Sequence, residues 1–210
     1  LARGPVDPEA LRPVVRLLAD FYRAAAPAIS DGAAFVARVE RQAEANHRVL
    51  ATAGISGVEV LIARQRESIA KHSTLLAQRA ADGCVVEAHG DLRPEHVFMD
   101  ASPAIIDCLE FDRELRVLDR AEELSFLYLE CTRMGHEATG RALLRDCLAQ
   151  LADHATDGLL HFYRSHRAAT RAKLYVWRAS EPDGGTPGEW LGRAGEYVRS
   201  ALEDSARSLG

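Results

Sequence analysis

Apolar residues recur every three or four positions through most of this chain, which is the spacing of one face of an α-helix. In the first such segment, Leu11, Val14 and Leu18 follow this spacing, and Asp7 is the expected N-cap. The same reasoning predicts helices over residues 7–26, 32–52, 57–82, 137–152, 155–179 and 187–207. Another helix is expected to begin near Asp119, which with Glu122 resembles a capping box.

The pattern changes between residues 84 and 106, where short apolar runs alternate with turn residues. Three strands are expected, at 84–88, 97–99 and 104–106, with a turn at 100–103 between the last two. We therefore predict a mainly α fold with a small β island, of the α+β class. The expected domain is single, with a helical part over 1–82, the island over 84–112 and a second helical part over 119–207.

Composition narrows the class of protein. The 210 residues are 47% hydrophobic, which is enough for one domain with a real core. The net charge of −5 argues against general nucleic-acid binding. No apolar run approaches the roughly 20 residues of a membrane span, and no signal peptide is visible, so we expect no membrane partner and a cytoplasmic location. Four cysteines without a CxxC pair fit core positions in a reducing compartment.

The unusual polar residues gather at the strand ends of the island. The sequence His-Gly-Asp-Leu-Arg-Pro-Glu-His occupies 89–96, and Asp107 follows an apolar pair. A hairpin between these segments would bring Asp91, His96 and Asp107 together. Carboxylates that accept a proton and bind Mg²⁺ suit phosphoryl transfer. The alternatives are simple turn residues, or a metal hydrolase using His89, which lacks the close histidine spacing of zinc motifs.

This segment resembles the catalytic loop of the kinase fold, in the form found in aminoglycoside phosphotransferases and related small-molecule kinases. Ile105-Ile106-Asp107 resembles the strand and metal-binding Asp of that family. The run CLEFDRELRVLDRAEELSFL at 108–127 is similar to a bacterial subgroup in which this region often precedes a P-loop ATPase domain. The resemblance implies that the chain is the C-terminal lobe of a protein-kinase-like fold, without the N-terminal lobe.

The resemblance also implies roles by position. Asp91 corresponds to the base that orients the substrate hydroxyl, and His89 would support the loop. Asp107 corresponds to the ligand of Mg²⁺ and ATP phosphates. His96 replaces an Asn that binds a second metal ion, and with Arg93 it lies where the cofactor binds. Glu110 has no certain equivalent but is a candidate near the metal. The expected substrate is a small metabolite or an aminoglycoside-like molecule.

Two features depart from the family. Imidazole prefers softer metals than Mg²⁺, so His96 indicates either an altered metal site or a lost second metal. In addition, nothing before residue 85 resembles a Gly-rich hairpin with its lysine, and no P-loop motif occurs. The chain contains two lysines, Lys71 and Lys173, both in predicted helices. The alternative to an ATP-dependent phosphotransferase is therefore a catalytically inactive kinase-like module that binds or regulates a partner.

The predicted helix at 155–179 carries a basic face. Its arginines at i, i+3 and i+7 would either grip a phosphate or acidic substrate, or pair with acids such as Glu122 or Glu123, or remain solvated. These arginines are Arg164, Arg167 and Arg171. The aromatic residues of the same helix are expected in the core. They are Phe162, Tyr175 and Trp177.

Overall fold

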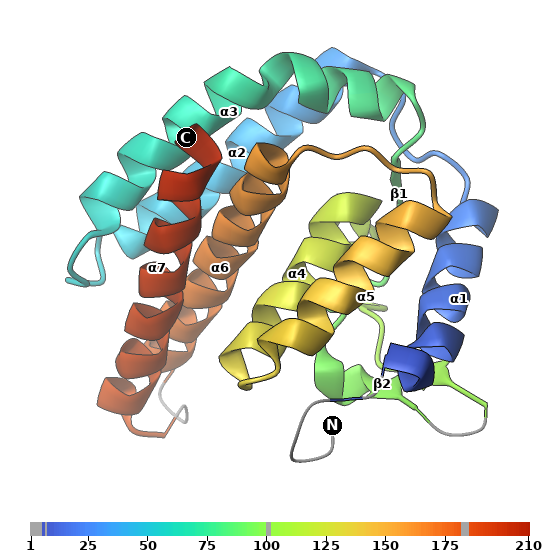
Figure 1. Cartoon of the computed structure of the whole chain (residues 1–210). Coiled ribbons are helices and arrows are strands. Elements are labelled where there is room, and N and C mark those ends of the chain that lie inside the picture. Colours follow the sequence, from blue (N-terminus) through green and yellow to red (C-terminus); the bar gives the residue numbers. More distant parts are fainter. Residues whose placement is uncertain (1–5, 7, 100–101, 182–184) are drawn as a thin grey trace. The chain divides into compact units, whose positions relative to one another are not determined.

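The computed structural model describes residues 6, 8–99, 102–181 and 185–210. In these residues it contains seven α-helices and two small antiparallel sheets, so the predicted mainly helical fold with a β island is confirmed (Figure 1). The chain divides into two compact units, of which unit 1 comprises 1–32 and 78–155, and unit 2 comprises 33–77 and 156–210. The predicted N-cap Asp7, and part of the turn at 100–103, lie outside the described residues.

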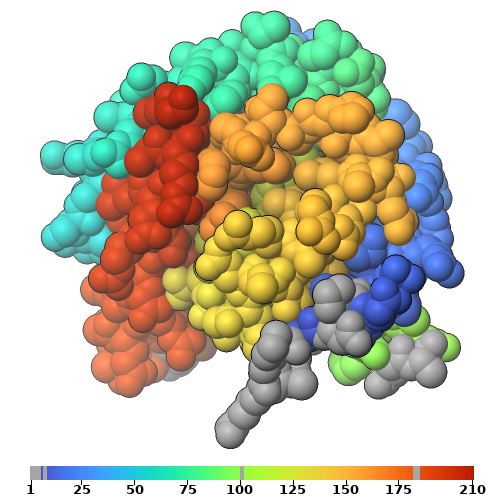
Figure 2. Space-filling model, viewed as in Figure 1, coloured from blue at the N-terminus to red at the C-terminus, as the bar shows by residue number. Residues whose placement is uncertain are grey.

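Unit 1 holds the β island and three helices. Helix α5 packs against both α1 and α4, and side chains of α1 and α5 form part of its surface (Figure 2). The helices are α1 (Pro8–Ala24), α4 (Arg120–Arg133) and α5 (Glu137–Gln150). The strands are β1 (Val85–Glu87), β2 (Val97–Phe98), β3 (Ala104–Ile105) and β4 (Val117–Asp119), with short 3-10 helices η1 (Pro94–His96) and η2 (Arg113–Leu115).

The strand pairing was predicted in part. Strands β2 and β3 form the expected hairpin, in which Val97 faces Ile105. Strand β1 pairs instead with β4, a strand that the sequence analysis did not predict, and Val86 faces Leu118. Strand β4 has three residues, all buried, immediately before a capped helix. Three residues are too few to show the alternation of buried and exposed side chains that marks a strand in sequence. Strand β4 is therefore recognised only by its pairing with β1.

A buried ion cluster fixes the start of α4. The Arg79 guanidinium binds Asp119 at 2.6 and 2.8 Å and Asp153 at 2.7 and 2.9 Å. Asp153 also accepts a hydrogen bond from Arg120 at 2.7 Å. The Asp119 carboxylate accepts from the Ala121 amide at 2.8 Å, which confirms the predicted N-cap. Each buried carboxylate therefore has a charged partner, as burial requires.

Unit 2 is built from helices joined by buried polar contacts. The Asn46 amide donates to Thr170 Oγ1 at 2.9 Å, and the Gln65 amide donates to Ser165 Oγ at 2.9 Å. Ser165 in turn donates to the Ala201 carbonyl at 2.9 Å. The helices are α2 (Gly32–Leu50), α3 (Val58–Ala81, whose last four residues belong to unit 1), α6 (Asp157–Ser180) and α7 (Pro187–Leu209).

Some predicted core positions are wrong. Phe162 is fully buried as expected, but Trp177 is 50% exposed, with Lys173 Nζ 4.9 Å from its ring centre. The aliphatic stem of Lys173 covers part of the Trp177 ring, which lowers the cost of leaving this amphipathic side chain at the surface. Three of the four cysteines are buried as predicted, whereas Cys108 is exposed. None of the helices in the described parts of the chain is long and apolar enough to cross a membrane.

Candidate functional site

The loop after β1 depends on a glycine. Gly90 has a φ of +88°, a conformation that residues with a Cβ rarely adopt. A Cβ at this position would lie 2.9 Å from Leu109 Cδ1 and 3.2 Å from Arg116 Cγ. The backbone conformation therefore favours glycine between the histidine and the aspartate of the motif, and a Cβ would also push the Leu109 side chain aside.

His89 ties this loop to the end of β3. Its Nε2 donates to the Ile106 carbonyl at 2.8 Å, and its Nδ1 accepts from the Asp91 amide at 3.3 Å. These two partners specify the neutral tautomer with the proton on Nε2. The side chain is buried and both of its nitrogens are used. His89 is thus a structural support for the loop, in line with its expected position.

His96 lies between the two acidic residues. It ends η1, and its Nδ1 donates to the Asp91 carbonyl at 2.9 Å. Its Nε2 lies 3.4 Å from Asp107 Oδ2. Asp91, His96 and Asp107 are therefore close together, as the sequence predicted. Because Nδ1 is used in the bond to Asp91, Nε2 is the ring nitrogen that faces the Asp107 carboxylate.

The two acids differ in exposure. The side chain of Asp107 is 77% exposed, and its backbone has a φ of +64°. Few non-glycine residues adopt this left-handed conformation, and it is enriched at functional sites. The side chain of Asp91 is 21% exposed, with Oδ2 3.8 Å from Arg93. One carboxylate is thus open to solvent, and the other is partly enclosed.

The remaining candidates, Arg93 and Glu110, have other surroundings. Arg93 forms an ion pair with Glu95 and lies 4.0 Å from Glu130. Glu110 is exposed and lines a cavity beside the loop. Across the described residues, no group of three or more His, Cys, Asp or Glu side chains is arranged to hold a metal ion. The metal and cofactor roles of these residues stay predictions.

A buried glutamate binds the backbone of the motif loop. Glu123 on α4 is fully buried and accepts from the backbone amides of His89, at 3.0 Å, and Gly90. The Tyr22 hydroxyl of α1 donates to the same carboxylate at 2.8 Å. Burial, together with Glu123, raises the pKa of Tyr22 well above its usual value. One carboxylate thus joins α1, α4 and the motif loop.

From the sequence, Glu123 was expected only as a possible partner for arginines, and Tyr22 was not a candidate. The local signal for Glu123 was its place in the first turn of a capped helix that follows the motif. No local signal marked Tyr22, which lies 101 residues away in sequence. Long-range contacts of this kind become visible only in the folded chain.

The basic face of α6 belongs to unit 2. Arg164 and Arg167 are buried, and Arg164 Nε lies 3.3 Å from Asp204 of α7. Asp204 also contacts His161 Nδ1 at 2.8 Å. Arg164 therefore pairs with an acid that the sequence analysis did not name. Binding of a phosphate by these arginines stays a prediction.

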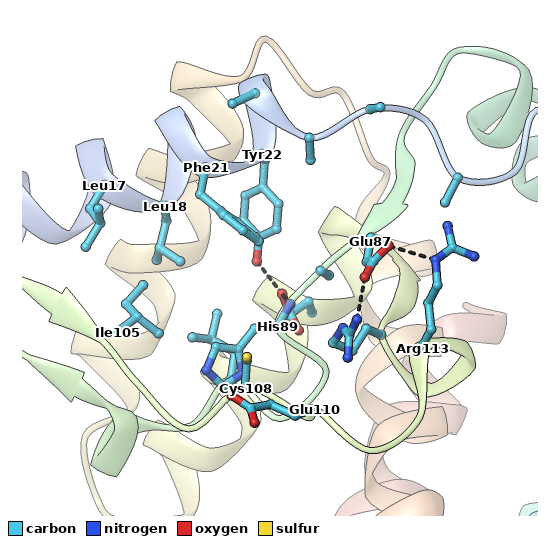
Figure 3. A pocket seen from close by; sticks show the side chains of 18 of the residues that line it. Leu17, Leu18, Phe21, Tyr22, Glu87, His89, Ile105, Cys108, Glu110 and Arg113 are labelled. Carbon is cyan, nitrogen blue, oxygen red and sulfur yellow. Dashed lines mark hydrogen bonds and ion pairs between the residues drawn. The ribbon is translucent and has the colours of Figure 1, made fainter.

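A cavity of about 990 Å³ opens beside the loop (Figure 3). The second half of α1 forms one wall, including Leu17 and Phe21. His89 and residues around β3 form the other side. Asp91, His96 and Asp107 do not line it. The cavity is therefore distinct from the cluster formed by these three residues.

Comparisons with known proteins give distant partial matches. No protein-family model matches the sequence, and no solved structure matches it. The uncharacterized protein Rv2004c of Mycobacterium tuberculosis and the uncharacterized protein Mb2027c of Mycobacterium bovis are each 36% identical to this chain over 116 residues. The match covers 55% of this chain and 23% of each relative. The chain is thus similar to about a quarter of the length of these relatives.

Proposed function

We propose that this chain is the C-terminal lobe of a kinase-like phosphotransferase, which transfers a phosphoryl group from ATP to a hydroxyl of a small molecule. The observation that carries the proposal is the His96 side chain, which contacts both the Asp91 backbone and the Asp107 carboxylate. Phosphoryl transfer needs a group that orients the acceptor hydroxyl beside a group that holds a metal ion. Asp91 and Asp107 are suited to these two tasks.

The support around Asp91 favours this role. The amide of Asp91 is held by His89 and its carbonyl by His96, so the backbone is restrained on both sides. Positioning contributes much of the rate in phosphoryl transfer, because the protein supplies little covalent chemistry. The partly enclosed Asp91 carboxylate would accept a hydrogen bond from the acceptor hydroxyl.

The Asp107 carboxylate is a suitable ligand for Mg²⁺. Mg²⁺ is commonly held by one or two carboxylates together with substrate phosphates and water, and the Asp107 carboxylate is exposed. When bound, the ion neutralises charge on the phosphate oxygens. The Asp107 carboxylate lies 3.4 Å from His96 Nε2, so a cation held by Asp107 would lie beside the imidazole.

A second candidate function, a non-catalytic module, is favoured by the lysines. Lys71 Nζ donates to the Ser208 carbonyl at 3.3 Å and to the Leu209 carbonyl at 2.8 Å. Lys173 lies over Trp177. Both belong to unit 2 and already have these contacts. A phosphate-binding lysine of the kinase type would therefore have to come from residues outside this chain.

The proposal is tested by phosphoryl transfer from labelled ATP and Mg²⁺ to a panel of small hydroxylated acceptors. The protein to use is the complete natural polypeptide that contains this chain. Asp91→Asn is expected to lower the rate by about 10²- to 10⁴-fold, the usual contribution of a general base. Asp146, a half-buried residue that pairs with Arg145, is the control, and Asp146→Asn should retain the rate. Equal rates for the wild type and Asp91→Asn would remove Asp91 from the reaction, and no transfer to any acceptor would favour the non-catalytic module.

A further inference from the structure

The cavity beside the loop is shaped for an apolar molecule. Its volume of about 990 Å³ lies at the upper end of the range for small-ligand sites. Leu17, Leu18 and Phe21 of α1 face Ile105 across it (Figure 3). Phe21 remains 42% exposed, although it belongs to the wall of a concave site. An apolar occupant would remove this surface from water, which is favourable.

Two polar groups of the lining, His89 and Glu123, already have hydrogen-bond partners. Both His89 nitrogens have partners. Glu123 accepts three hydrogen bonds, one of them from Tyr22. These groups therefore offer little to a polar ligand, and a polar group pushed between them would lose its hydrogen bonds to water without replacement. The part of the cavity around His89 and Glu123 therefore favours an apolar group of the ligand.

The opposite end has an available cation. Glu87 is held by Arg113 Nε at 2.8 Å through one oxygen and by Arg116 through the other. Arg116 also donates to the Leu109 carbonyl. Two guanidinium groups thus share one carboxylate. Arg113 uses Nε for this bond, and its terminal nitrogens form no hydrogen bond or ion pair within the described residues, so they can bind an anion.

We propose that this cavity binds a small molecule with an apolar body and a single carboxylate, which Arg113 holds at the rim. The apolar body lies between α1 and β3, against His89. Glu110 also lines the rim and carries the opposite charge, so it disfavours an anion and sets a limit on affinity. The proposal is independent of the phosphotransferase activity, because the cavity does not include Asp91 or Asp107.

Cys108 provides a direct measurement of occupancy. It lines the cavity and is exposed, whereas the other three cysteines are buried. Decanoate, below its micelle concentration, serves as the probe, and the rate of maleimide labelling at Cys108 is followed by peptide mass spectrometry. At ten times its dissociation constant, a ligand that covers the thiol slows labelling by about tenfold. Decylamine, with the same body and the opposite charge, is expected to protect much less.

Two variants with matched controls localise the site. Arg113→Ala is expected to weaken decanoate binding about tenfold, since it removes a charge-assisted hydrogen bond. Arg16→Ala, at an exposed position of α1 outside the cavity, should leave binding unchanged. Phe21→Asp should abolish binding, whereas Phe111→Asp, at an 80% exposed phenylalanine that does not line the cavity, should not.

The outcomes are distinct. Protection of Cys108 by decanoate that requires about tenfold more decanoate in Arg113→Ala supports the proposal. No protection by decanoate, equal protection by decylamine, or unchanged protection in Arg113→Ala would overturn it. Because Arg113 is an exposed rim residue, its variant tests the site even if Phe21→Asp does not fold.

Discussion

The loop that carries Asp91 is predicted to depend on Glu123. In Glu123→Gln the shape of the side chain is kept, but one carboxylate oxygen becomes an amide that donates hydrogen bonds. The three groups around Glu123, the amides of His89 and Gly90 and the Tyr22 hydroxyl, are all donors. At least one of them must then face another donor inside a fully buried site.

The magnitude follows from these contacts. A hydrogen bond to a charged group contributes about 1.5–3 kcal/mol, and a buried donor left without a partner costs about 1–3 kcal/mol. The glutamine carbonyl still accepts some of these three hydrogen bonds. We therefore expect a loss of about 3 kcal/mol in the free energy of unfolding. For a chain of this size, that corresponds to a fall in Tm of about 6–12 °C.

Urea denaturation measures the global effect, and amide hydrogen exchange at His89 and Gly90 measures the local one. A loss of about 3 kcal/mol accelerates exchange of these amides by about 150-fold if they exchange by opening of the same unit. Glu67→Gln, an exposed change on α3, is the control and should alter stability by less than about 0.5 kcal/mol. The reasoning is wrong if Glu123→Gln behaves like this control in both measurements.

Two further predictions concern unit 1. Gly90→Ala should cost at least about 1–2 kcal/mol in urea unfolding, because alanine is strained at a φ of +88° and its Cβ meets Leu109; unchanged stability would contradict this geometry. Burial alone would raise the pKa of Asp153, but Arg79 and then Arg120 lower it to about 2. A depressed pKa stabilises the fold above about pH 4, and this stabilisation is lost as the pH falls toward about 2. Asp153→Asn should therefore flatten the acid side of the stability–pH curve measured by urea midpoints, and an unchanged acid dependence would exclude Asp153 as its source.

Local patterns were sufficient for most helices and for part of the site. The predicted helix over 32–52 corresponds to α2, Gly32–Leu50, because apolar periodicity depends only on nearby residues. The N-cap at Asp119 was predictable for the same reason. The proximity of His96 and Asp107 followed from a hairpin of two adjacent short strands, which is also a local feature.

Features that join distant segments were not predictable. Strand β4 exists because it pairs with β1, about 30 residues earlier, and nothing within its three residues marks it as a strand. Trp177 has the spacing of a core residue, yet it is half exposed because Lys173 covers its ring in place of a packed neighbour. Burial of an amphipathic ring depends on what the rest of the chain places against it.

By itself, the sequence determined the helix positions, the turn at Gly90 and the presence of Asp91, His96 and Asp107 around one hairpin. These depend on backbone conformation and on spacing over a few residues. Only the tertiary structure decided that Glu123 and Tyr22 hold the loop, that Arg79 joins Asp119 to Asp153, and that α1 borders a cavity. Each of these is a contact between segments far apart in sequence, where many pairings are compatible with the same local pattern and packing selects one.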